Sequence, residues 1–183
     1  MYKICKSEQS ALRQRELELG LVEVMLTRNY DNISVSDLCD HLQIPRKSFY
    51  RYFSNKDGAF LALLDHTLER CNNYIDPCTV TADGFQAYYE FWLEQKPLLD
   101  ALEKSELSSK LVAQTYEFAM KDRDFVRRLM SRFPGVEEHV VVMFLSTGLI
   151  STVLHWHKTG FKQSPSQLAS TIDRVFSSPL LPF

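Results

Sequence analysis

Hydrophobic residues recur at intervals of three and four along most of this 183-residue chain, which is the spacing of amphipathic α-helices. Near the N-terminus Leu17, Leu21 and Met25 form such a stripe and predict a helix from about residue 8 to residue 28. Gly20 inside this helix indicates a close crossing with another helix, because glycine is otherwise unfavourable there. No segment alternates as a β-strand does and no internal repeat is visible, so we predict an all-α fold.

Two helix-start signals flank a proline in the segment 33–57. Ser34 followed by Asp37 has the form of a capping box, which predicts a helix from about residue 35. Pro45 disfavours helical geometry in the residue before it and fits well at a helix start, so a second helix is expected from about Arg46. Ser54 and Asp57 repeat this spacing and predict the start of a third helix.

The second of these helices is predicted to have one apolar and one basic side. Phe49 and Phe53 are four residues apart and share a face, whereas Arg46 and Lys47 lie elsewhere on the helix. Residues 40–56 contain four basic residues and one acidic residue. Two helices joined by a short turn, of which the second has a basic surface, are typical of a helix-turn-helix. In such a motif the second helix lies in the DNA major groove. An ordinary helical hairpin with a solvated charged face is the alternative.

The motif Tyr-x-Tyr-Phe-x-x-Lys at residues 50–56 resembles the DNA-binding signature of the tetracycline-repressor (TetR) family of bacterial transcription regulators. The similarity covers about residues 10–65. It implies a helix-turn-helix domain at residues 1–55 and a larger helical domain at residues 56–183 for dimerisation and effector binding. It also implies that positions 46 to 48 contact bases and that Tyr50, Tyr52 and Lys56 hold DNA phosphates. The full set of expected DNA contacts is Ser34, Arg46, Lys47, Ser48, Tyr50, Arg51, Tyr52 and Lys56.

Lys56 supports a phosphate contact independently of the resemblance, because a cation in the first turn of a helix is unfavourable unless an anion lies nearby. The chain departs from the family pattern at three positions. Gln43 stands where glycine is common in the turn, Pro45 replaces the usual serine or threonine, and Gly58 replaces a leucine. The first two bear on the angle at which the second helix meets the groove.

Further helices are predicted downstream, and the last two resemble the C-terminal half of the same family. The predicted ranges are residues 56–74, 84–95, 98–104, 108–130, 136–157 and a last helix from residue 165. The uncharged run 140–154 is short for a membrane span and predicts a buried helix. The run from Trp156 to Lys162, followed by Ser164-Pro165, resembles most the branch that includes activators of dihydroxyacetone kinase genes. The resemblance implies a homodimer formed by the last two long helices.

Composition and cysteine usage indicate a soluble cytoplasmic protein. Hydrophobic residues make up 45% and charged residues 24% of the chain, with a net charge of -2. No signal peptide is apparent at the N-terminus. The cysteines at positions 5, 39, 71 and 78 form no CxxC pair and no zinc spacing, so reduced thiols are expected. Cys71 and Cys78 are seven residues apart, which leaves a redox-sensing pair as an alternative to packed thiols.

Aromatic residues concentrated in the second half are candidates for a pocket that binds a small hydrophobic or aromatic effector. The set comprises Tyr88, Tyr89, Trp92, Tyr116 and Phe144. The same spacing also fits an ordinary aromatic core. His155 and His157 point to different faces of a helix, so no metal site is predicted, and no cofactor is expected. The chain has no GxSxG, HExxH, P-loop or dinucleotide-binding motif, which argues against an enzyme.

The sequence therefore predicts a homodimeric transcription repressor that binds palindromic operator DNA and is released by a small molecule, without a membrane partner. A regulator of the same kind that activates transcription, or that responds to a protein partner in place of a small molecule, is the alternative.

Overall fold

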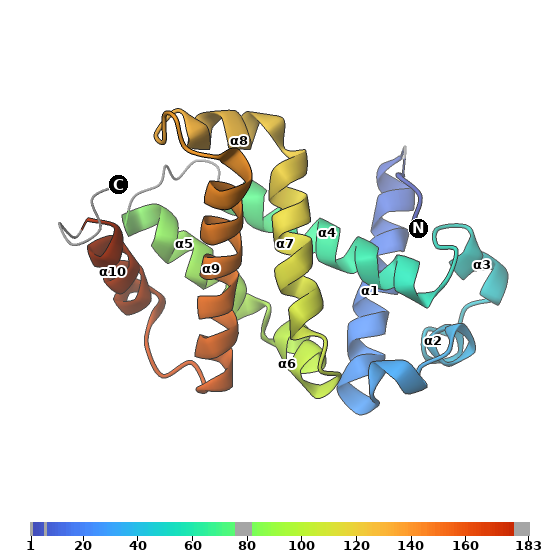
Figure 1. Ribbon diagram of the computed structural model, residues 1–183. Helices are drawn as coiled ribbons and strands as arrows, with labels where there is room; N and C mark the ends of the chain where they lie inside the picture. The colour runs from blue at the N-terminus through green and yellow to red at the C-terminus, as the bar shows by residue number, and fades with distance from the viewer. Residues whose placement is uncertain (1, 6, 76–81, 178–183) are drawn as a thin grey trace. The chain divides into compact units, whose positions relative to one another are not determined.

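The computed structural model, described for residues 2–5, 7–75 and 82–177, confirms the all-α fold (Figure 1). The β-structure in these ranges is an isolated antiparallel bridge between Tyr2 and Phe53. The helices are α1 (Glu8–Thr27), the 3-10 helix η1 (Tyr30–Asn32), α2 (Val35–His41), α3 (Arg46–Tyr50), α4 (Lys56–Ile75), α5 (Ala82–Glu94), α6 (Lys96–Lys104), α7 (Ser108–Lys121), α8 (Arg123–Met130), α9 (Glu138–Lys158) and α10 (Pro165–Phe176).

The predicted helix over residues 108–130 is wrong, because the chain breaks at Asp122 into α7 and α8. Asp122 is the N-cap of α8, and its carboxylate accepts the backbone N–H of Phe125 at 2.9 Å. A side chain that captures a backbone amide in this way competes with continuation of the preceding helix. The apolar residues on both sides of the break share one stripe, which concealed it in the sequence.

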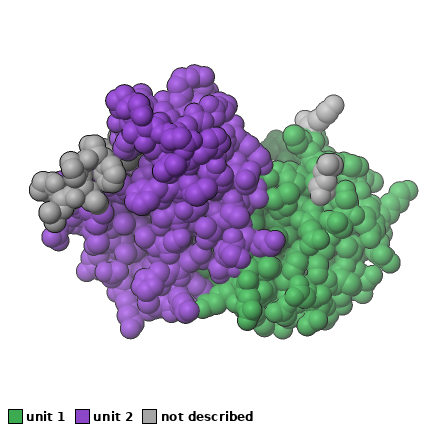
Figure 2. Space-filling model, viewed as in Figure 1, with its two compact units in different colours: residues 1–67, 97–107 green, residues 68–96, 108–183 purple. Residues whose placement is uncertain are grey.

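The described chain forms two compact units, residues 1–67 with 97–107 and residues 68–96 with 108–183 (Figure 2). Helix α4 contributes its first part to unit 1 and its last turns to unit 2. The predicted boundary between a DNA-binding domain at residues 1–55 and a larger domain at residues 56–183 stays a prediction.

Unit 1 is built on α1, which crosses the end of α2 at a glycine. A Cβ atom added to Gly20 would lie 2.6 Å from Cδ2 of Leu42, so only glycine allows this approach without displacement. Met25, Phe49 and Phe53 are almost completely buried beside it. The predicted close crossing at Gly20 is therefore confirmed, and Leu42, its partner in the crossing, is half-buried.

In unit 2, α7 packs along α9 and α10 packs on α5 (Figure 1). Helix α9 is long and apolar enough to cross a membrane by length and composition. The expectation that α9 is buried is only half right. Val142 and Ile150 are fully buried, but Val140 is 61% exposed and Phe144 is 60% exposed. Helix α9 therefore presents a second, apolar face to solvent.

Candidate nucleic-acid interface

Helix α2 begins with the predicted capping box. The Oγ of Ser34 accepts the backbone N–H of Asp37 at 3.1 Å, and the Asp37 carboxylate accepts the backbone N–H of Ser34 at 2.8 Å. Arg28 adds an ion pair to the same carboxylate at 2.7 Å. The hydrogen bonds from Ser34, assisted by Arg28, lower the pKa of Asp37 to about 2. Ser34 thus fixes the start of α2, and its predicted DNA contact stays a prediction.

The turn between α2 and α3 contains a residue with left-handed backbone geometry. Gln43 has a φ of +52°, the region that favours glycine. The backbone N–H of Ile44 closes the turn by donating to the Cys39 carbonyl at 2.9 Å. Pro45 is the N-cap of α3 and provides no side-chain cap. The unusual residues at positions 43 and 45 therefore still produce a compact helix-turn-helix.

Helix α3 separates an apolar side from a cationic side, as the sequence predicts. Phe49 is completely buried, whereas Arg46 and Lys47 are exposed and Ser48 is half-buried. Tyr50 is 44% exposed, and the Arg46 guanidinium lies 3.4 Å from the Tyr50 hydroxyl oxygen. Arg46 and Tyr50 are one helical turn apart, so together they form an exposed polar pair beside Lys47.

The two predicted contact residues after α3 have different environments. Arg51 is exposed, but Tyr52 is only 8% exposed and packs beside the Phe53 ring. Helix α3 ends at Tyr50, and the following turn directs the ring of Tyr52 towards the interior. Arg51 is therefore exposed and Tyr52 is packed in the free protein, and their DNA contacts stay predictions.

Lys56 is held by Tyr30, a residue that the sequence analysis missed. The Lys56 ammonium donates to the Tyr30 carbonyl oxygen at 2.7 Å and lies 4.2 Å from the centroid of the Tyr30 ring. These electron-rich groups stabilise a cation that the helix dipole of α4 disfavours. The ammonium has three donors, so this bond leaves it able to bind a phosphate as well.

Tyr30 connects several elements of unit 1. Its hydroxyl donates to the Asp57 carboxylate at 2.7 Å, and its backbone N–H donates to the Ser105 Oγ at 3.1 Å. Burial, reinforced by Asp57, raises the pKa of Tyr30. Tyr30 therefore fixes the start of α4 relative to η1 and α6. No local sequence signal marks it, because its partners are 27 and 75 residues away.

The aromatic residues predicted to line an effector pocket occupy separate places in unit 2. Tyr89 and Trp92 are completely buried, with Tyr88 packed against both rings. Tyr116 bonds to His139 at 2.8 Å, while Phe144 lies on the exposed face of α9. Three of these side chains thus pack together, one bonds to His139 and one is exposed; that they line an effector pocket stays a prediction.

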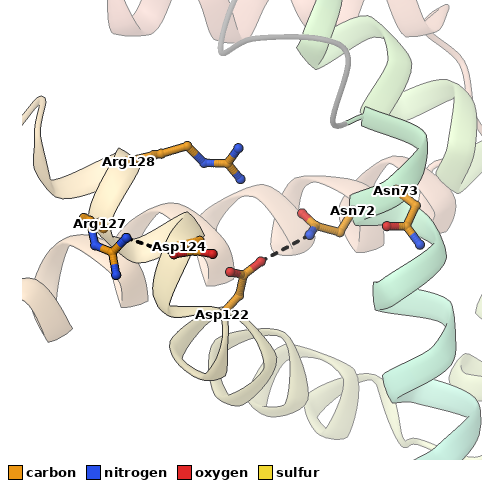
Figure 3. A pocket seen from close by; sticks show the side chains of 6 residues that line it. All are labelled: Asn72, Asn73, Asp122, Asp124, Arg127 and Arg128. Carbon is orange, nitrogen blue, oxygen red and sulfur yellow. Dashed lines mark hydrogen bonds and ion pairs between the residues drawn. The ribbon is translucent and has the colours of Figure 1, made fainter.

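A pocket of about 500 Å³ opens in unit 2 and is lined by polar residues of α4, α8 and the turn before α8. Figure 3 shows Asn72 extending from α4 towards Asp122, with Asp124 beside Asp122 at the start of α8. Asn72 donates to the Asp122 carboxylate at 3.4 Å, and Arg127 pairs with Asp124 at 3.0 Å. The remaining lining residues are Asn73 and Arg128. Amides and balanced charges suit a polar ligand better than a hydrophobic one.

The cysteines of the described residues have no thiol partner. Cys71 is buried, and burial raises the pKa of its thiol to about 12, which keeps the thiol protonated. Cys78, the other half of the suggested redox pair, lies outside the described residues.

Comparison with known proteins identifies the N-terminal part of the chain. Residues 20–63 match the family of bacterial regulatory proteins called the tetR family. This range contains the capping box, the turn, α3 and the Tyr30–Lys56 contact. No curated protein sequence matches the chain.

Solved structures share the fold over nearly the whole chain. The fatty acid degradation regulator FadR from Bacillus halodurans is 12% identical, with a TM-score of 0.58 and coverage of 97% of this chain and 98% of that one. FadR from Bacillus subtilis in complex with stearoyl-CoA is 14% identical, with a TM-score of 0.61 and coverage of 90% of this chain and 97% of that one. The dihydroxyacetone kinase operon activator DhaS is 14% identical, with a TM-score of 0.60 and coverage of 90% and 94%.

The match at residues 20–63 includes the helix-turn-helix, and the all-α fold extends through the rest of the chain. Residues 20–63 therefore match the tetR family of bacterial regulatory proteins, and the described chain shares its all-α fold with the solved structures named above.

Proposed function

We propose that the protein is a homodimeric repressor that binds a palindromic operator and is released from it by a small molecule. The observation that carries this proposal is the two-sided character of α3. Phe49 anchors the helix completely inside unit 1, which leaves Arg46 and Lys47 exposed at its N-terminal end. Arginine and lysine in that position of a groove-reading helix bind guanine edges.

The exposed face of α9 supports a homodimer. Val140, Met143 and Phe144 are between 49% and 61% exposed, and Gly148 has open space around its Cα. On α10, Val175 is 45% exposed. Contiguous apolar surface of this kind marks an interface, and a two-fold axis through it brings the same patch of both copies together. The two copies of α3 must then meet half-sites about 34–36 Å apart, or a multiple of that distance.

The polar pocket of unit 2 is the site that we propose for the effector. Asn72 and Asn73 belong to α4, the same helix that begins at Lys56 beside the DNA-binding surface. A ligand that prefers one position of α4 shifts the population that can bind DNA, and the coupling must be reciprocal. The effector is then a small polar molecule able to bond with amides, carboxylates and guanidinium groups, in contrast to the hydrophobic ligand that the sequence suggested.

Activation of transcription is the second candidate. DhaS, which has the same fold, is an operon activator, so the fold serves this function in another protein. Binding to operator DNA is common to both candidates, whereas their effects on transcription are opposite.

Selection of bound genomic fragments tests the proposal. The recovered sites are expected to align on a palindrome with two equal half-sites, and transcription from a template with that site is expected to fall when the protein is added. Recovery of unrelated fragments would reject the operator, and a rise in transcription would favour activation. A metabolite that binds the native protein raises its melting temperature. If this metabolite is the effector, it lowers the affinity of the protein for the operator, and the operator lowers the affinity of the protein for the metabolite by the same factor.

A further inference from the structure

Residues 2–5 form an extended strap on unit 1, next to the turn that follows α3. Tyr2 and Phe53 make the antiparallel bridge, and the backbone N–H of Lys3 donates to the Tyr52 carbonyl at 3.0 Å. Paired backbones of this kind lie about 5 Å apart. The strap therefore has a fixed position beside the residues that connect α3 to α4.

Side chains at both ends hold the strap in place. The Tyr2 hydroxyl donates to the Asp65 carboxylate at 2.7 Å, and the Cys5 thiol donates to the Gln14 side-chain oxygen at 2.7 Å. Asp65 and Gln14 are 8% and 2% exposed, so both anchors are buried groups of α4 and α1.

The Tyr2 ring also packs on a network of polar side chains inside unit 1. The edge-to-face contact with His66 has a centroid distance of 5.5 Å, and His66 bonds to Glu18 at 2.7 Å. Glu18 is completely buried and pairs with Arg15 at 3.1 Å. The Glu18 carboxylate therefore has a partner on each side, and Tyr2 packs on one of these partners.

The outward side of the strap is cationic and uncovered. Lys3 is exposed, and Ile4 is 89% exposed even though its neighbours in the chain are anchored. Lys3 lies across from Tyr52, and Tyr52 follows the exposed residue Arg51. The strap thus places one further cation at the C-terminal end of the groove-reading helix.

We propose that the strap is a second DNA-binding element, in which the Lys3 ammonium binds a phosphate flanking the base pairs read by α3. This inference rests on the proposed DNA binding. Base edges are met by the N-terminal residues of a recognition helix, whereas Lys3 lies beyond its C-terminal end, where the backbone is the nearest part of the duplex. Lys3 therefore contributes to affinity without contributing to base preference.

Salt titration of Lys3→Ala tests the proposal. A phosphate contact releases condensed counterions, so the slope of log K against log salt is expected to fall by about 0.9 for each bound protomer. Between 0.05 and 0.2 M salt, this corresponds to about a 3.5-fold smaller loss of affinity per protomer. Operator and random DNA should change alike. Lys162→Ala, an exposed lysine of unit 2, is the matched control and should keep the slope of the unaltered protein.

A variant that releases the strap separates position from charge. Tyr2→Ala removes the bond to Asp65 and the ring contact with His66, so it is expected to lower the slope as Lys3→Ala does. In the Lys3→Ala background, Tyr2→Ala should have no further effect on the slope, because both changes remove the same contact. Melting curves show whether either variant has lost its fold, and Lys3→Gln provides a second variant that keeps a long polar side chain.

The outcomes distinguish this inference from the proposed function. If the unaltered protein binds DNA with a salt-dependent affinity and both Lys3 variants keep its slope, the strap contact is refuted and DNA binding stands. If the unaltered protein binds neither operator nor random DNA, both proposals are refuted. A change confined to the operator would also contradict the strap contact, since a phosphate contact is independent of sequence.

Discussion

Substitution of Gly20 by alanine tests the helix crossing that positions the helix-turn-helix. The new Cβ would lie 2.6 Å from Cδ2, 2.7 Å from Cδ1 and 2.9 Å from Cγ of Leu42. Carbon atoms make their best contacts at about 3.5–4.0 Å, so the Leu42 side chain or α2 must move by roughly 1 Å. Leu42 is the C-cap of α2 and directly precedes the turn at Gln43.

Two effects of opposite sign determine the change in stability. Alanine in a helix interior is favoured over glycine by about 1 kcal/mol, whereas overpacking of a formed core costs about 1–3 kcal/mol. We therefore expect Gly20→Ala to lower the free energy of unfolding by about 1 kcal/mol. In a Leu42→Ala background the clash is absent, and the same substitution should raise the free energy of unfolding by about 1 kcal/mol.

Urea unfolding of the four proteins at one protein concentration measures this coupling. Equal concentrations are necessary because the proposed dimerisation would contribute to apparent stability. A coupling energy of about 2 kcal/mol between positions 20 and 42 is expected. If Gly20→Ala stabilises both backgrounds equally, the two helices do not make the close contact described above.

Four further substitutions test other parts of the structure. Gln43→Gly should raise the free energy of unfolding by about 0.5–1 kcal/mol, because the relief of left-handed strain at φ +52° outweighs the added entropy of the unfolded chain. A lower free energy of unfolding in urea would show that position 43 is not strained. Lys56→Ala should lower the melting temperature, because it loses the bond to Tyr30, and should reduce the slope of log K against log salt by about 0.9 per protomer. Tyr50→Phe should weaken binding to operator and to random DNA alike and leave this slope nearly unchanged. An unchanged slope for Lys56→Ala would leave it a purely structural residue. Phe144→Asp should convert the proposed dimer to folded monomers in sedimentation at micromolar concentration, and a persistent dimer would place the interface elsewhere.

Local signals made the helix-turn-helix predictable from the sequence. Ser34 and Asp37 form their capping box within four residues, and Phe49 and Phe53 share a face because of helical periodicity alone. Gly20 was informative because a glycine inside a helix requires a compensating contact. These features depend on neighbours in the chain, so a single sequence contains them.

Long-range contacts could not be predicted in the same way. The Tyr30 bonds to Asp57 and Ser105 and the Tyr2 bond to Asp65 connect residues 27 to 75 positions apart. Their partners depend on how helices pack, and neither tyrosine belongs to a helical stripe. The aromatic residues of α5 illustrate the opposite difficulty, since periodicity alone does not distinguish an aromatic core from an aromatic pocket.

Determining the base preference of α3 variants tests the central claim most directly. DNA with a randomised half-site is selected for binding to Arg46→Ala, to Lys47→Ala and to the unaltered protein. The same selection with Lys162→Ala is the control. Each of the two α3 variants is expected to lose discrimination at one position per half-site, by about 1–3 kcal/mol if the contact to guanine is bidentate. If both keep the affinity and the base preference of the unaltered protein, α3 does not read the major groove.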